Sequence, residues 1–163
     1  MSERLRRIIA WWQIICGFLG LAVLGASLLN LVPNGRIWVE QTLGWINYYA
    51  GIGFFSLAIA AGRALLNHEA WGLWTSFGCQ AIQVVSLAIR QGPWVQIGAG
   101  PLLGLKISDT QFTVSAGFNA SFFVGTLLSG PAFVVTFNVV ALVWAVLLFR
   151  EATRVRAVGA AAA

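Results

Sequence analysis

The polar side chains inside the apolar stretches of this sequence are neutral, and two amides stand out by their position. Gln83 and Asn138 lie near the middle of long apolar runs, at similar depths if each helical residue rises about 1.5 Å, and Gln80 is close by. Amides at one depth on neighbouring helices can bind a hydroxyl or amide of a ligand. Alternatively they bond the helices to each other, which contributes about 0.6 kcal/mol. The sequence favours this second interpretation without excluding the first.

Ionisable residues avoid the interiors of the apolar runs. Every Asp, Glu, Lys and Arg, and the single His68, lies at the end of a run or in a link between runs. Charged groups inside membrane segments typically mark ion and proton pathways, so their absence argues against proton-coupled transport. His68 and Glu69 are adjacent, but a metal site needs three or four ligands. The sequence therefore predicts no metal site, no cofactor, no catalytic residues and no enzymatic activity.

The two cysteines, Cys16 and Cys79, also lie within apolar runs, at similar estimated depths. A redox pair needs accessible thiolates of low pKa, whereas an apolar environment raises the pKa of a thiol. We expect both residues to act as small buried hydrophobic side chains.

The composition indicates which elements must position these residues. Of 163 residues, 59% are hydrophobic and 9% are charged, against roughly 25% charged in a soluble domain. A membrane-spanning helix needs about 20 apolar residues. The sequence predicts an all-α membrane protein, a single polytopic domain over 1–163 with four transmembrane helices. The expected spans are 8–32, 42–62, 71–89 and 131–149. Within them, Ala58 with Gly62 and Gly72 with Ser76 have the small-residue spacing that allows close helix packing.

Basic residues at the ends of the runs predict the orientation. With the N-terminus inside, seven basic residues lie on the cytoplasmic side and three on the other, so both termini should be cytoplasmic. The inner group is Arg4, Arg6, Arg7, Arg63, Arg150, Arg154 and Arg156, and the outer group is Arg36, Arg90 and Lys106. These residues form no stripe that could follow a phosphate backbone, so nucleic acid is not an expected partner. The expected location is the cytoplasmic (inner) membrane of a bacterium, with the lipid bilayer as partner.

The tryptophans are expected to anchor the spans, because indole rings prefer the headgroup level. The inner belt would contain Trp11, Trp12, Trp71, Trp74 and Trp144, and the outer belt Trp38, Trp45 and Trp94.

A different pattern fills the region between the third and fourth expected spans. Residues 95–122 alternate apolar and small or polar side chains, which is the period of a β-strand. They predict an extracytoplasmic β-hairpin that turns at Asp109 and Thr110, or through a four-residue loop from Ser108 to Gln111. The facing pairs would be Ile107 with Phe112, Leu105 with Val114, Leu103 with Ala116, and Ile97 with Phe122.

An open hairpin is unfavourable in hydrocarbon, because unpaired backbone groups there each cost several kcal/mol. We therefore expect it at the outer surface, with its apolar face on the helices. The alternative is one helix over 119–149, kinked at Gly130 and Pro131.

Two functions are compatible with these features. The first is a non-catalytic accessory or scaffolding subunit of a larger membrane complex, whose partners would be other membrane protein subunits. The alternative is binding or transport of a lipophilic small molecule or lipid within the helix bundle. That function would use Gln80, Gln83 and Asn138.

Overall fold

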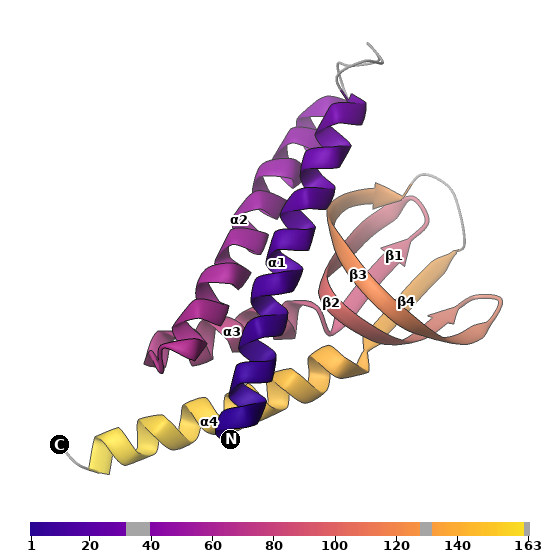
Figure 1. Cartoon of the computed structure of the whole chain (residues 1–163). Helices are drawn as coiled ribbons and strands as arrows, with labels where there is room; N and C mark the ends of the chain where they lie inside the picture. Colours follow the sequence, from indigo (N-terminus) through magenta and orange to yellow (C-terminus); the bar gives the residue numbers. More distant parts are fainter. Residues whose placement is uncertain (32–39, 128–131, 162–163) are drawn as a thin grey trace.

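The computed structural model describes residues 1–31, 40–127 and 132–161, which form four helices and one four-stranded sheet (Figure 1). The elements in chain order are α1 (Glu3–Leu31), α2 (Glu40–Leu66), α3 (Ala70–Ile82), β1 (Val85–Ile89), β2 (Gly92–Ser108), β3 (Phe112–Leu127), β4 (Phe133–Asn138) and α4 (Val139–Ala161).

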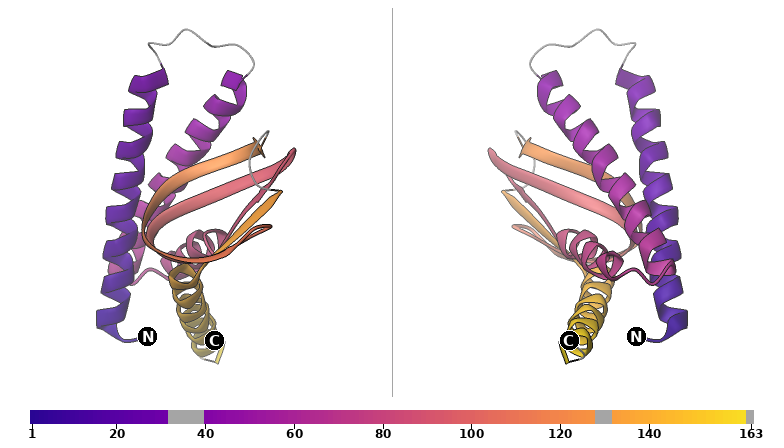
Figure 2. Two further views of the ribbon diagram at one scale, coloured as in Figure 1. Left: turned by 90° about the vertical axis from the view of Figure 1, so that its right-hand side faces the viewer. Right: turned by 90° about the vertical axis from the view of Figure 1, so that its left-hand side faces the viewer.

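Helices α1 and α2 form a long antiparallel pair (Figures 1 and 2). Small residues bring their backbones together: a Cβ added at Gly62 would lie 2.7 Å from the carbonyl oxygen of Ala10. Two segments of the described helices are long and apolar enough to cross a membrane, Glu3–Ala26 with 24 residues and Trp45–Leu66 with 22.

Helices α3 and α4 pack at the end of this pair where the N-terminus lies (Figures 1 and 2). The apolar core there joins all four helices, through Ile9 of α1, Leu65 of α2, Leu73 of α3 and Leu148 of α4. The N-terminal ammonium group of Met1 pairs with Glu151 of α4 and fixes the same end.

The four strands form one antiparallel sheet in the order β1-β4-β2-β3, in which β1 also pairs with β2. Strand β2 is long enough to pair along one edge with two partners: its first part with β1, at Val95 with Leu87, and its last part with β4, at Leu105 with Phe137. Its other edge pairs with β3 over the whole length. Because β1 and β4 also pair with each other, β2 and β3 must curve strongly, as Figure 2 shows.

The predicted spans 71–89 and 131–149 are not continuous helices. Residues 85–89 and 133–138 are strands, joined to α3 and α4 at Gln83 and Asn138. Hydropathy does not distinguish a buried helix from a buried strand, and β-branched and aromatic residues such as Val134, Val135 and Phe137 favour the strand. The prediction of an all-α membrane protein with four transmembrane helices is therefore wrong, and the chain is not a four-helix transmembrane bundle.

The predicted hairpin is present with the expected register. Ile107 faces Phe112, Leu105 faces Val114, Leu103 faces Ala116, and Ile97 faces Phe122. The Ser108 N–H donates to the Gln111 carbonyl at 3.0 Å and closes the turn. The alternative of a helix over 119–149 is wrong. The hairpin is also longer than predicted and belongs to the larger sheet.

The hairpin lies beside α1 and α2, and not beyond their ends (Figures 1 and 2). Ile97 is buried in one core with Cys16 of α1 and Phe54 of α2, near the middle of both helices, and Phe122 packs against this core. The apolar face of the hairpin therefore contacts the helices, as expected, but it lies beside them and does not cap their ends.

Candidate functional site

The two faces of the sheet differ in polarity. One side of the sheet is here named the outer face. It carries exposed apolar side chains, those of Val85, Ile89, Leu103, Ile107, Phe112, Val114, Phe133 and Phe137. The inner face is the opposite side, where Lys106 stands between Thr113 of β3 and Thr136 of β4. The same apolar side also carries Ile97 and Phe122, which pack against α1 and α2, so this side is partly buried and partly exposed.

A cavity of about 270 Å³ lies against the inner face. All four strands and both helix–strand junctions contribute to its lining. The polar lining residues are Gln83, Ser86, Gln96, Lys106, Ser115, Thr136 and Asn138. Both parts of β2 take part, through Gln96 and Lys106, so the sheet curves around the cavity.

The structure brings together Gln83 and Asn138, the two amides that the sequence places at one depth. The N–H of Asn138 donates to the carbonyl of Val84, next to Gln83, at 2.8 Å. Gln83 ends α3 and its Nε2 donates to the carbonyl of Cys79 at 2.7 Å. Asn138 begins α4, because its Oδ1 accepts from the N–H of Ala141 at 3.2 Å. These residues therefore meet at two chain junctions, and not across two continuous helices.

Sequence reasoning missed Lys106 as a site residue, although the alternating pattern already placed it opposite the apolar face. Because the sequence predicts a helix over 131–149, it does not place Thr136 of β4 beside Lys106. The adjacent Gly104 lets side chains close over the inner face, since an added Cβ would lie 2.8 Å from Ser115 Oγ.

Gln80, the third predicted amide, is buried within α3 and does not line this cavity. A second buried polar pair, not predicted, joins α1 to α3. Ser76 Oγ donates to Gln13 Oε1 at 2.8 Å, and Gln13 Nε2 donates to the Ser76 carbonyl at 3.4 Å. Gln13 and Ser76 provide hydrogen-bond partners for each other, so we interpret the pair as a structural contact between α1 and α3.

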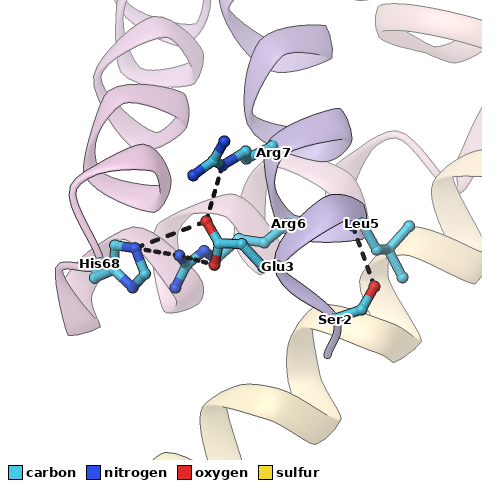
Figure 3. A network of polar contacts seen from close by, with 6 residues as sticks. All are labelled: Ser2, Glu3, Leu5, Arg6, Arg7 and His68. Atoms are coloured by element: carbon cyan, nitrogen blue, oxygen red, sulfur yellow. Dashed lines mark hydrogen bonds and ion pairs between the residues drawn. The ribbon is translucent and has the colours of Figure 1, made fainter.

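A charged cluster stands at the start of α1 (Figure 3). Glu3 accepts from Arg6 and, at 2.9 Å, from Nε of Arg7, and His68 Nε2 lies 3.8 Å from Glu3 Oε1. His68 has a φ of 62°, so the turn between α2 and α3 directs its ring toward Arg6 and Glu3. Within the described residues no group of three or more His, Cys, Asp or Glu side chains could hold a metal ion.

Most of the predicted tryptophan anchors with described side chains are exposed. Trp11, Trp12, Trp45, Trp71 and Trp74 are exposed, whereas Trp144 packs against the core between the helices. Trp38 lies outside the described residues, and Trp94 is a residue of β2.

Cys16 and Cys79 are free, buried, and members of one apolar core. Burial raises the pKa of the Cys79 thiol to about 11. A neutral thiol in this position is a packing residue.

Comparisons of this chain with protein-family models, with curated proteins and with solved structures find no match.

Proposed function

We propose that this chain is an integral membrane protein that binds a small ligand in the cavity on the inner face of its sheet. The observation that supports the binding function best is the cavity itself, because Gln83, Asn138 and Lys106 converge on it from separate elements. Concave sites with a few convergent polar groups are the usual form of a small-molecule site. The lining combines these polar side chains with the apolar residues Leu87, Ala88, Val95, Ile97, Leu102 and Val134, so we propose a ligand that has polar groups and is not purely lipophilic.

The exposed side of α1 supports membrane insertion. Along the helix it carries first Arg4 and Arg7, then Trp11, and then Ile15 and Phe18. Cations, indoles and apolar side chains follow in the order in which a lipid leaflet presents headgroups, interface and acyl chains.

The same end of the molecule contains most of the basic residues, which favours a cytoplasmic orientation. Arg63 lies in the last turn of α2, near the start of α1, and the pairing of Met1 with Glu151 places α4 there as well. We therefore place the N-terminus, the link between α2 and α3, and α4 on the cytoplasmic side of the membrane.

Filling the cavity tests the binding function. Ser86 on the inner face and Val85 on the outer face are neighbours in β1. The variant Ser86→Leu should place extra carbon in the cavity, whereas Val85→Leu should not. Asn138 is unsuitable for this test because its side chain also caps α4.

Each protein is extracted in lipid nanodiscs and the retained small molecules are identified by mass spectrometry. We expect one compound enriched with the wild type and with Val85→Leu but lost from Ser86→Leu. Equal retention by all three proteins, or no enriched compound with any of them, would contradict the proposal.

The outer face favours a second function, that of an accessory or scaffolding subunit. Phe112 and Val114 expose 63% and 61% of their surface next to each other on β3. Apolar patches of this kind often mark contacts with another protein. Co-purification of a membrane protein at fixed stoichiometry, lost in Phe112→Ser with Val114→Ser and retained in Thr113→Ser, would support this function.

A further inference from the structure

Lys106 is the only lysine of the chain and lines the inner cavity. Its cross-strand neighbours are Thr113 and Thr136, both uncharged. Among the described residues no carboxylate lies within ion-pair distance of Lys106. The nearest acidic residue in sequence, Asp109, accepts instead from the N–H of Ala132 at 2.9 Å. The cavity therefore contains a positive charge that the described protein groups do not neutralise.

The remaining polar groups complete a site for oxygen atoms. Ser86, Ser115 and Thr136 have hydroxyl groups that can donate, and the side-chain amide of Gln96 can donate as well. Among the residues that the structure describes, no Asp or Glu lines the cavity. We propose that the ligand of this cavity is an anion, a phosphate group that pairs with Lys106 and accepts from the neighbouring hydroxyl groups. This inference rests on the proposed binding function and names the ligand class of that site.

Two sources can supply the phosphate: a soluble phosphate compound, or a lipid headgroup that enters from the membrane. A single lysine allows both to be examined by chemical labelling. The protein in maltoside micelles, which contain no phosphate, is treated with an amine-acetylating reagent, and the rate of Lys106 acetylation is measured by mass spectrometry. The N-terminal amine, paired with Glu151 away from the sheet, is the internal reference.

One arm adds inorganic phosphate, a second adds phosphatidylglycerol, and a control adds chloride at equal ionic strength. At about ten times the dissociation constant a ligand leaves about a tenth of the sites free, so acetylation should slow about tenfold. Slowing by phosphate identifies a soluble source, and slowing only by phosphatidylglycerol identifies the headgroup. Unchanged acetylation in both arms would overturn the proposal.

Two variants separate this inference from the proposed function. Lys106→Arg should keep a rise in unfolding temperature on addition of the effective phosphate probe, and Lys106→Met should lose it. If Ser86→Leu releases a retained compound while Lys106→Met keeps it and phosphate stabilises neither Lys106 variant, the cavity binds a ligand that is not an anion. If no compound is retained by the wild type either, the binding function itself fails.

Discussion

The side chain of Asn47 binds both backbone groups of Val124, so that an amide of α2 continues the sheet. Nδ2 of Asn47 donates to the Val124 carbonyl at 2.8 Å, and Oδ1 accepts from the Val124 N–H at 2.7 Å. Among the described strands β3 is at the edge of the sheet, and an unpaired N–H and C=O at such an edge are unfavourable in an apolar environment. Asn47 satisfies both groups and fixes the sheet beside the helices.

We therefore expect Asn47→Ala to destabilise the protein by about 2–4 kcal/mol, since two hydrogen bonds are lost and two backbone groups are left unpaired. Denaturant unfolding in mixed micelles measures the change. Tyr49→Phe, a change at an exposed side chain of the same helix, is the control and should have little effect. Equal stability of Asn47→Ala and wild type would show that the contact is unimportant.

The close approach of α3 to α2 depends on Gly72. An added Cβ there would lie 2.7 Å from Cβ of Ala64 and 2.8 Å from the Ala64 carbonyl carbon. Gly72→Ala should destabilise the protein by about 1–3 kcal/mol, as overpacking does. Gly78→Ala in the same helix meets nothing within 4 Å and should be neutral or stabilising by about 0.5–1 kcal/mol. Thermal unfolding midpoints of the two variants measure the difference. A higher midpoint for Gly72→Ala than for Gly78→Ala would refute this packing.

The buried pair of Gln13 and Ser76 predicts a non-additive mutant cycle. Ser76→Ala should destabilise by about 1–3 kcal/mol because Gln13 Oε1 loses its donor. Once Gln13 is replaced by Leu, the same Ser76→Ala change should be less harmful. The four unfolding free energies give the coupling, and a coupling of zero would mean that the two side chains act independently.

The pKa of Cys79 predicts its reactivity. Because burial raises that pKa to about 11, the thiol stays neutral at pH 8 and its alkylation rate should still rise above pH 9. The same pKa shift makes the free energy of unfolding depend on pH, because the unfolded thiol ionises at about 9 and the folded thiol at about 11. The free energy of unfolding should be unaffected below pH 9 and should fall as pH increases toward 11. Iodoacetamide rates in a Cys16→Ala background measure the first effect. A plateau near pH 9 would indicate an accessible thiol.

The pairing of β2 with β4 can be tested by a disulfide, since Lys106 and Thr136 face each other. Paired residues lie at a Cα separation that allows a disulfide. Lys106→Cys with Thr136→Cys should therefore cross-link on oxidation, in a background without the native cysteines. The pair Lys106→Cys with Val135→Cys has side chains on opposite faces and should not.

Local sequence patterns determined the long hairpin and its register. The side chains between Ile97 and Phe122 alternate, and the turn at residues 108–111 sets a register that places the apolar residues of both strands on one side. A one-residue slip would turn the apolar residues of one strand to the opposite face. The apolar runs that became α1 and α2 were likewise recognisable, because length and hydropathy suffice to identify helices able to cross a membrane.

Only the tertiary structure decided how the runs at 71–89 and 131–149 divide between helix and strand. In each run the part that forms a strand, β1 or β4, does so because β1, β2 and β4 pair with one another over long separations in sequence. Those hydrogen bonds are not encoded in any single segment. The same pairings create the inner face. The polarity of Gln83 and Asn138 and their position within the apolar runs identify them from the sequence. Lys106 joins them only because β2 lies between β3 and β4, and local periodicity does not contain that relation.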